Sequence, residues 1–252
     1  MTDLHTHILP CIDDGSSSLE ESLALLAMLG EQGVEDVVLT PHYYGQRRSV
    51  GQFLERRDAA YARLTEAYEG GIRFRRASEC NISTCANSDF SELRPVAIEG
   101  TEYILTEMSF EKDWDGGLWK RLADLRDYAG LRPVIAHVEV YPAVQRKPEY
   151  AYRLIDEGCL LQMNCDSAAD MTRSSLAYAL LSHGQIHCLG SDTHNTSTRP
   201  PRYGEAAEKI RAEFGTETLA GLQENMSAIL ANERVAAARG TPVKRKLLGG
   251  YA

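Results

Sequence analysis

Two histidines near the start of the chain are spaced so that they share one face of a predicted β-strand. His5 and His7 flank Thr6, and successive side chains of a strand point to opposite faces, so both imidazoles project to the same side. Neutral imidazole is the commonest metal ligand in proteins. A packed or solvated pair would show the same spacing, so the metal-site hypothesis depends on partners elsewhere in the chain.

The elements that must position such partners alternate regularly along the chain. Helical patterns separate short apolar runs, and the first helix is predicted to begin at Ser17 or Ser18. This alternation predicts a parallel sheet with crossover helices. We predict a single-domain α/β fold, a distorted seven-stranded, TIM-like (β/α) barrel, with an open doubly wound sheet as the alternative. The predicted strands are Leu4–Leu9, Val34–Thr40, Ile72–Ala77, Tyr103–Glu107, Pro133–Ala136, Leu160–Asn164 and Ile186–Gly190. The later helices are predicted near Gly51–Tyr68, Trp114–Tyr128, Glu149–Glu157, Met171–Ser182, Gly204–Phe214 and Thr218–Ala231.

Histidines and acidic residues recur on or just after these strands. In a parallel barrel the carboxyl ends of all strands meet at one face, so such side chains would converge. Taken singly, a glutamate at a strand end is usually solvated and a lone histidine is usually structural. The joint pattern favours a metal site, and we predict that His183 and His187, which do not fit it, are structural. The candidates on the strands and at their ends are His5, His7, His42, Glu79, Glu107, His137, Asp192 and His194.

The kind of metal follows from the types of ligand. Together with Asp14, these candidates offer imidazole and carboxylate groups without thiolate, which suits Mn, Fe or Zn better than an all-oxygen Ca or Mg site. Nine ligands are too many for one ion, so we predict two or three divalent ions. The charge of three such ions exceeds that of the four carboxylates by two units, which matches a phosphate dianion.

The composition narrows the classes of partner. A formal net charge of -9 argues against a nucleic-acid partner held by phosphate neutralisation. No apolar run approaches the roughly 20 residues that span a bilayer, and no signal-peptide pattern opens the chain. The six cysteines form no C-x-x-C pair, which favours free thiols in a cytoplasmic protein.

Other hydrolytic chemistries lack their motifs. No cysteine is followed six positions later by arginine, which excludes the cysteine-based phosphatases, and neither a Walker loop nor a G-x-S-x-G elbow is present. Amidohydrolases also open a barrel with His-x-His. They typically end with a lone aspartate on the last strand, whereas this chain has Asp192 and His194 there.

Three segments carry a family pattern: Asp3–Pro10 with Ile12–Gly15, Thr40–His42, and Ser191–Asn195. They resemble the polymerase-and-histidinol-phosphatase (PHP) superfamily, and within it the bacterial metal-dependent protein-tyrosine phosphatases of capsule and exopolysaccharide loci. The resemblance extends from Asp3 to about Asn225. It implies a distorted seven-stranded β/α barrel with a trinuclear, usually manganese, site. We expect this barrel to span residues 1–240, followed by a polar tail over residues 241–252.

The resemblance assigns ligands to three ions. It implies that Glu79 bridges the first and second ions, that Asp13 is the alternative to Asp14, and that Arg199 contacts phosphate. With Arg199, we expect Asp192 and His42 to take part in catalysis. The implied sets are His5, His7, Glu79 and Asp192 for the first ion, Glu79, Glu107 and His137 for the second, and Asp14, His42 and His194 for the third.

The chain departs from the family pattern at two places. The family continues its strand-5 histidine as His-Pro-Glu-Arg, and the arginine helps hold phosphate, but Val140 stands there. Tyr43 and Tyr44 follow His42 where the family has a second histidine, and they either stack on the substrate ring or pack on the barrel. The candidates to replace the missing cation are Arg47, Arg48 and Arg146.

These observations predict a metal-dependent phosphomonoesterase. The expected substrate is phosphotyrosine on a protein, in particular the tail of a tyrosine kinase that regulates capsule or exopolysaccharide synthesis. The alternatives are a PHP-type phosphatase acting on histidinol phosphate or a sugar phosphate, and a metal-binding regulatory module with little turnover. We expect neither nucleic-acid binding nor membrane insertion, and a homo-oligomer is compatible with the sequence.

Overall fold

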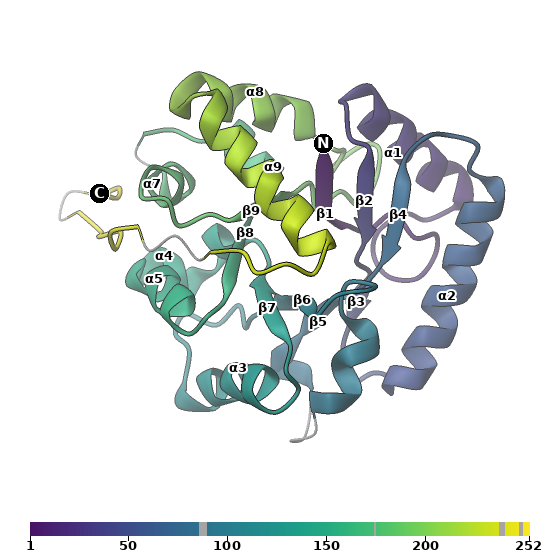
Figure 1. The fold of residues 1–252 in the computed structure, drawn as a ribbon, viewed down its shortest axis with the longest axis horizontal. Helices are drawn as coiled ribbons and strands as arrows, with labels where there is room; N and C mark the ends of the chain where they lie inside the picture. The colour runs from purple at the N-terminus through teal and green to yellow at the C-terminus, as the bar shows by residue number, and fades with distance from the viewer. Residues whose placement is uncertain (86–89, 174, 237–239, 247–248) are drawn as a thin grey trace.

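Parallel strands and helices alternate along the chain in a computed structural model that describes residues 1–85, 90–173, 175–236, 240–246 and 249–252 (Figure 1). The strands form two parallel sheets. The three-stranded sheet has the order β1 (Thr2–Thr6), β2 (Asp36–Leu39) and β4 (Arg73–Arg76). The six-stranded sheet has the order β3 (His42–Tyr43), β5 (Glu79–Asn81), β6 (Tyr103–Glu107), β7 (Arg132–Ile135), β8 (Leu160–Asn164) and β9 (Cys188–Gly190).

The second and third predicted strands are each followed by a short further strand. β2 ends at Leu39 and β3 begins at His42, and between them Pro41 has no N–H group for a ladder hydrogen bond. The pairing register with the neighbouring strand is the same before and after this break. Asp36 pairs with Arg73 and His42 pairs with Glu79, an offset of 37 residues in both cases. The break therefore leaves two candidate ligands opposite each other on neighbouring strands.

The curled sheet brings the first strand next to the segment that follows the last strand. The Asp192 N–H donates to the carbonyl of His5 at 2.8 Å, and the His7 N–H donates to the carbonyl of Thr193 at 3.0 Å. Thr6 and Thr193 form an isolated parallel bridge. The predicted single-domain α/β fold with a parallel sheet is confirmed, whereas a barrel of seven strands is not, because the described strands divide into two sheets.

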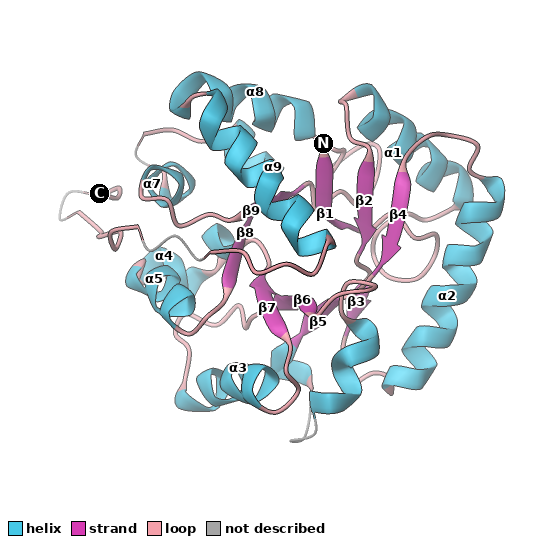
Figure 2. Cartoon of the chain, viewed as in Figure 1, coloured by secondary structure: helices cyan, strands magenta, loops and turns pink. Residues whose placement is uncertain are grey.

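The longer predicted helices are present, and they lie around the strands (Figure 2). Helix α9 packs against β1 and β9, α3 against β7, and α5 against β8. Ser18 caps the first helix, as predicted, by accepting the Glu21 N–H at 3.2 Å. The helices are α1 (Leu19–Glu31), α2 (Val50–Ala67), α3 (Gly116–Asp127), α5 (Glu149–Asp156), α7 (Leu176–Ser182), α8 (Tyr203–Phe214) and α9 (Thr216–Leu230).

Shorter elements were not predicted. They are one-turn helices and 3₁₀ turns in the loops that follow strands, where too few residues are present for a periodic apolar pattern. Part of the predicted helix Met171–Ser182, at Ser174, lies outside the described residues. The short elements are η1 (Ile82–Thr84), η2 (Phe90–Val96), η3 (Val138–Val140), α4 (Pro142–Arg146) and α6 (Cys165–Ala169).

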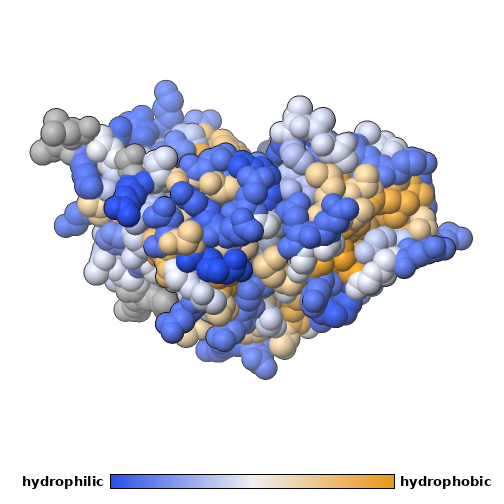
Figure 3. All heavy atoms as spheres, turned by 90° about the horizontal axis from the view of Figure 1, so that it is seen from above, coloured by the Kyte–Doolittle hydropathy of each residue, from blue (hydrophilic) through white to orange (hydrophobic). Residues whose placement is uncertain are grey.

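The exterior agrees with the composition. The face seen in Figure 3 is mostly hydrophilic, with smaller apolar areas, most visibly on the side where α1 and α2 lie. In the described part of the chain, no helix is long and apolar enough to cross a membrane. All six cysteines are free, as predicted, although the sulfur atoms of Cys80 and Cys85 lie 3.7 Å apart.

Candidate metal centre

The two histidines of the opening motif converge as their spacing predicts. His7 lies one residue beyond the end of β1, yet its Nε2 atom is 3.0 Å from the Nε2 atom of His5. Both side chains are fully buried. At most one proton can lie between two facing ring nitrogens, so this pair is poorly satisfied by itself and well suited to share a cation.

Glu79, at the start of β5, lies at the centre of the histidines. Its Oε2 atom is 3.5 Å from Nε2 of His5, 3.4 Å from Nε2 of His7 and 2.8 Å from Nδ1 of His42. Its Oε1 atom lies 2.8 Å from Nε2 of His137. Burial alone would raise the pKa of this carboxyl, but His5, His137 and His42 hold it well below the usual range. A buried carboxylate thus contacts four imidazoles.

Asp192 closes the cluster from the segment after β9. Its Oδ1 atom is 3.5 Å from Nε2 of His5, 3.4 Å from Nε2 of His7 and 3.6 Å from Nδ1 of His194. Asp192 and His137 both have left-handed backbone conformations, with φ of 52° and 32°. Such conformations cost energy in residues other than glycine and are frequent at functional sites.

The structure separates the roles of the two adjacent aspartates. Asp14 Oδ1 lies 3.3 Å from Nε2 of His42 and 3.7 Å from Nε2 of His194. Asp13 instead binds the far side of His7, with Oδ2 2.7 Å from Nδ1, and accepts the His42 N–H at 2.9 Å. The geometry therefore favours Asp14 over Asp13 as the ligand-type residue beside His42 and His194.

Among the described residues, three groups of side chains have ligand atoms that all lie within 4.8 Å of one another. They contain all of the predicted ligands except His137, and they group these ligands differently from the three sets that the family resemblance implies. His7 and His42 each occur in two groups, and His137 reaches the cluster through Glu79. The groups are His5, His7 and Asp192; His42, Glu79 and Glu107; and His7, Asp14, His42 and His194.

The histidines differ in their electrostatic surroundings. Burial lowers the pKa of His7, but the charge and hydrogen bond of Asp13 together with the nearby Glu79 outweigh it and raise the pKa to about 9. For His42, burial is likewise outweighed by the close carboxylates of Asp14 and Glu79 together with the charge of Asp13, and the pKa rises to about 11. Burial and the nearby His7 lower the pKa of His194 to about 4. The neighbouring carboxylates thus favour positive charge at His7 and His42.

The donor set fits divalent cations. Glu79 Oε2 is buried and makes no hydrogen bond within the described residues, because its 2.8 Å contact with His42 lacks hydrogen-bond geometry. His194 Nε2 is buried without a hydrogen-bond partner as well. An unsatisfied buried polar atom costs about 1–3 kcal/mol, and bound cations would satisfy both of these atoms.

Several supporting residues were not predicted. The Gln162 carbonyl oxygen accepts the His137 N–H at 2.8 Å and lies 3.1 Å from Nδ1 of His5. The Gln162 amide donates to Asn164 at 3.0 Å, and Asn164 donates to Asp192 at 2.8 Å. Gln162 and Asn164 alternate at the end of an apolar strand, which is a signal that sequence reasoning could have used.

Two more side chains, those of Asp3 and Asn81, support the cluster through hydrogen bonds. Asp3 accepts the backbone N–H groups of His5 at 3.2 Å and Ser191 at 2.8 Å, and burial raises its pKa to about 6. Asn81 donates to Glu107 at 2.6 Å. Burial and the charge of Glu79 raise the pKa of Glu107. Partners of this kind fix the orientation of ligands.

Arg199 lies at the rim of the cluster. One of its guanidinium nitrogens donates to Asp192 Oδ2 at 2.7 Å, and its side chain is 42% exposed. The structure thus places Arg199 beside the cluster, and its contact with phosphate stays a prediction. Arg146 is exposed at the end of α4, and Val140 is half-buried in η3.

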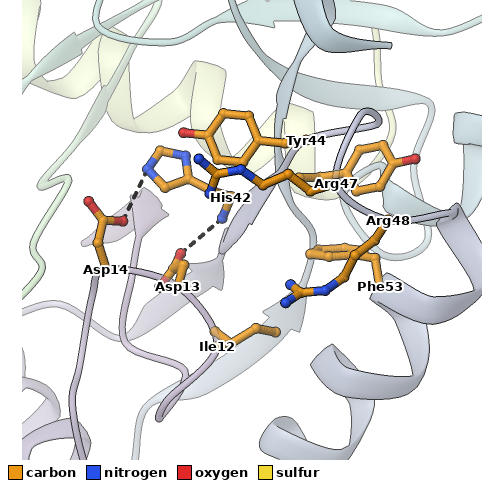
Figure 4. A pocket seen from close by; sticks show the side chains of 9 residues that line it. Ile12, Asp13, Asp14, His42, Tyr44, Arg47, Arg48 and Phe53 are labelled. Atoms are coloured by element: carbon orange, nitrogen blue, oxygen red, sulfur yellow. Dashed lines mark hydrogen bonds and ion pairs between the residues drawn. The ribbon is translucent and has the colours of Figure 1, made fainter. Parts of the chain in front are cut away.

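A pocket of about 370 Å³ opens beside His42 (Figure 4). Tyr43 is buried with its ring 5.0 Å from that of Phe53, so it packs inside the fold and is not free to stack on a substrate. Tyr44 is half-buried, with its ring 5.2 Å from that of His42. We call this cavity the Arg47–Arg48 pocket; it is lined by Ile12, Asp13, Asp14, His42, Tyr43, Tyr44, Arg47, Arg48 and Phe53.

Comparison with known families agrees with this site. The model of the family described as capsular polysaccharide synthesis, CpsB/CapC, matches residues 1–231. The chain belongs to the CpsB/CapC family. The predicted membership is therefore confirmed over most of the chain.

Relatives of this CpsB/CapC protein include enzymes from several bacteria. The tyrosine-protein phosphatase YwqE of Bacillus subtilis is 28% identical over the whole of both chains. The tyrosine-protein phosphatase CpsB of Streptococcus agalactiae is 28% identical over 93% of this chain and 100% of its own. The putative tyrosine-protein phosphatase CapC of Staphylococcus aureus is 25% identical over 93% of each chain.

Solved structures agree with the fold of this CpsB/CapC protein. A chain from the crystal structures of the metal-dependent tyrosine phosphatases YwqE from Bacillus subtilis and CpsB from Streptococcus pneumoniae superimposes with a TM-score of 0.83. It is 28% identical and covers 97% of this chain and 100% of its own. The lactonase Lmo2620 from Listeria monocytogenes, 12% identical, has a TM-score of 0.60 and covers 92% of this chain and 95% of its own. That similarity concerns the fold alone.

Proposed function

We propose that this CpsB/CapC protein is a metal-dependent phosphomonoesterase that dephosphorylates phosphotyrosine on proteins. The observation that carries the proposal is the buried Glu79 carboxylate, which lies within 3.5 Å of the ring nitrogens of four histidines. Relatives named as tyrosine-protein phosphatases align over most or all of both chains, which supports the reaction and the phosphotyrosine substrate. The proposed protein substrate is the tail of a tyrosine kinase that regulates capsule or exopolysaccharide synthesis.

The cluster is proposed to hold two or three divalent ions, with manganese as the first choice and iron or zinc as alternatives. When bound, such ions lower the pKa of water and neutralise the charge that develops on a transferred phosphoryl group. Glu79 is central, and His7 and His42 each lie between two groups of ligands. The residues proposed as ligands are His5, His7, Asp14, His42, Glu79, Glu107, His137, Asp192 and His194.

The residues around the cluster are proposed to have different roles, some in orienting the ligands and one in binding phosphate. Asp13 accepts a hydrogen bond from Nδ1 of His7, which leaves Nε2 as the metal-facing nitrogen. Gln162 bonds His5 in the same way. Arg199 is held by Asp192 at the rim, where its remaining N–H groups can bind the oxygens of a phosphate dianion. The leaving tyrosine oxygen takes its proton from solvent.

The fold supports this proposal through its geometry. We propose that the two sheets act as one distorted seven-stranded barrel, with β2–β3 and β4–β5 each serving as one interrupted strand. The catalytic barrel would span residues 1–240, with residues 241–252 as a tail, in a cytoplasmic protein. Hydrogen bonds between β1 and the segment after β9 bring His5, His7 and Asp192 to one place.

Phosphate release from a tyrosine-phosphorylated peptide tests the proposal. The protein is loaded with manganese, iron or zinc, bound metal is quantified by mass spectrometry, and phosphate release is measured. We expect bound metal and turnover in the wild type and the loss of both in His7→Ala. The matched control is His183→Ala, because His183 caps the end of α7 and hydrogen-bonds Thr241, away from the cluster.

Each alternative function predicts a different result. Hydrolysis of histidinol phosphate or a sugar phosphate in preference to the phosphotyrosine peptide would replace the proposed substrate class. Bound metal without hydrolysis of any of these compounds would indicate a regulatory module. Equal activity in the wild type and His7→Ala would exclude the cluster as the catalytic centre.

A further inference from the structure

The Arg47–Arg48 pocket is lined by both acidic and basic side chains. Asp14 and His42 form the side next to the metal cluster, whereas Arg47 and Arg48 come from the loop between β3 and α2 (Figure 4). The pocket is therefore continuous with the edge of the cluster and extends away from it. A group bound there would lie beside whatever the cluster holds.

The positive charge in this pocket is not compensated. Asp13 is bound to His7 at 2.7 Å, and Asp14 faces His42 at 3.3 Å, so both carboxylates are engaged by the cluster. Among the residues that the structure describes, no carboxylate pairs with Arg47 or Arg48. By contrast, Arg202 binds Asp170 through two nitrogens, at 2.7 and 2.9 Å. The pocket thus presents two guanidinium groups without an anion.

Local structure holds the two arginines in place. The backbone N–H groups of Arg47 and Arg48 both donate to the carbonyl of Tyr44, at 2.9 and 3.3 Å, which forms a turn. The Arg47 guanidinium carbon lies 4.6 Å from the centre of the Tyr44 ring, a cation–π contact. Ser49 then caps α2 with a capping box. The loop is therefore organised by its own hydrogen bonds and needs no ligand to form.

We propose that the Arg47–Arg48 pocket binds an anionic side chain that flanks the phosphotyrosine of the substrate. This inference rests on the proposed function, in which the phosphate lies at the cluster. Consecutive Cα atoms are 3.8 Å apart, so a residue one or two positions from the phosphotyrosine is near enough to enter the adjoining pocket. Guanidinium groups bind carboxylates and phosphates through paired hydrogen bonds, and the apolar floor of Ile12 and Phe53 accommodates the stem of such a side chain.

The pocket would therefore select substrates. Peptides with glutamate, aspartate or a second phosphorylated residue beside the phosphotyrosine would be preferred over peptides with glutamine there. Two arginines in a partly exposed site would contribute a preference of about 10-fold, and added salt would weaken it. Arg47 and Arg48 would thus be specificity residues for the peptide.

Kinetics with matched peptides test this inference. Phosphotyrosine peptides with flanking glutamate, flanking glutamine or a second phosphotyrosine are compared on the metal-loaded enzyme. We expect the ratio of kcat/KM for the glutamate peptide over the glutamine peptide to be about 10 in the wild type and about 1 in the Arg47→Gln/Arg48→Gln variant. Arg48→Glu should shift the preference toward a peptide with flanking lysine. Arg56→Gln, an exposed arginine of α2 outside the pocket, is the matched control and should keep the wild-type ratio.

A binding measurement gives a readout that does not depend on turnover. Fluorescence anisotropy with peptides that carry a non-hydrolysable phosphonate analogue should show the same loss of discrimination in Kd. If kcat/KM falls equally for all peptides in the double variant, the arginines bind the phosphate that is cleaved and the inference is wrong. A wild-type ratio of 1 also overturns it. A wild type that hydrolyses no phosphotyrosine peptide would instead overturn the proposed function, which separates the two failures.

Discussion

The candidate metal centre has a buried half and an open half, and the two halves differ in how they are supported. The side chains of His5 and His7 are fully buried, and that of Asp192 is 8% exposed. On the other side, His42 is 14% exposed and Asp14 is 66% exposed. The buried half thus has almost no exposed surface, whereas the open half borders the Arg47–Arg48 pocket.

This difference predicts different roles for the two halves. The buried half is attached to strands β1 and β9, and Gln162 and Asn164 on β8 hold its ligands by hydrogen bonds. The open half includes Asp14, which lies on a loop after β1. Rigid strands fix the position of ligands, while loops adapt to what binds. We therefore expect changes in the buried half to affect metal binding, and changes in the pocket that borders the open half to affect the substrate.

The largest effect is expected for Glu79, which contacts four histidines. Glu79→Gln removes the charge and half of the acceptor capacity at the centre of the cluster. Substitution of a residue that only hydrogen-bonds a metal ligand already lowers metal affinity or activity by about 10–100-fold. For Glu79→Gln we therefore expect a loss of at least about 100-fold in kcat, together with a lower metal content. Metal analysis and phosphate release measure the two quantities.

Glu139 offers a control for this substitution. It is buried, and it accepts the Asn164 N–H at 3.0 Å, but it is absent from the groups of candidate ligands. Glu139→Gln keeps this acceptor and should retain the wild-type metal content. A normal metal content in Glu79→Gln would contradict the central role of Glu79 and weaken the distinction between the two halves.

Substitution of Asp13 tests whether the hydrogen bond that orients His7 is as important for metal binding as the His7 ligand itself. Asp13→Asn keeps the size of the side chain but weakens the 2.7 Å contact with Nδ1 of His7. We expect a 10–100-fold loss of metal affinity, with a smaller change in KM for the peptide. Titration of the metal-free protein with manganese measures the affinity. An unchanged affinity would mean that His7 is oriented without Asp13.

The sequence allows prediction of the residues that converge but not of how each one is held. The His5–His7 spacing correctly predicts the pair, because the period of a strand is a local property. It does not distinguish Asp13 from Asp14, because that choice depends on where the loop places each carboxylate relative to His7 and His42. Long-range contacts of this kind have no local pattern.

The same limit applies to the strands. The apolar run Val34–Thr40 indicates one strand, and Pro41 suggests that its ladder is interrupted. That a second strand continues at His42 with the same offset to Glu79 depends on pairing with a distant segment. The role of Gln162 likewise follows from its neighbours across the sheet, not from its own sequence context.

Arg199 is expected to show a smaller effect, because it lies at the rim and is 42% exposed. Arg199→Gln removes a charged donor to the phosphate and one of the two donors to Asp192 Oδ2, where Asn164 still donates. We expect kcat/KM to fall about 10-fold for all phosphotyrosine peptides alike, with Arg199→Lys recovering part of it. Steady-state kinetics with the glutamate and glutamine peptides measures this. A loss confined to the glutamate peptide would instead place Arg199 with the specificity residues.

The smallest effect on activity is expected at His187, a buried histidine that lies before β9 and outside the cluster. Nδ1 accepts the Leu161 N–H at 3.1 Å, and burial without a carboxylate partner lowers the pKa of His187 to about 4. Below pH 6.5 the unfolded chain binds a proton that the folded chain does not bind until about pH 4. This contribution to stability is therefore present above pH 6.5 and is lost as the pH falls.

His187→Asn removes this titration and retains an acceptor for Leu161. Between pH 7 and pH 5, the free energy of unfolding should fall by about 2 kcal/mol more in the metal-loaded wild type than in the variant. Urea denaturation at both pH values measures the difference, and turnover at pH 7 should be unchanged. Equal pH dependence in the two proteins would show that His187 is protonated inside the fold. In that case, burial without a carboxylate partner would not explain why the pKa of His187 differs from that of His7, which Asp13 helps to raise.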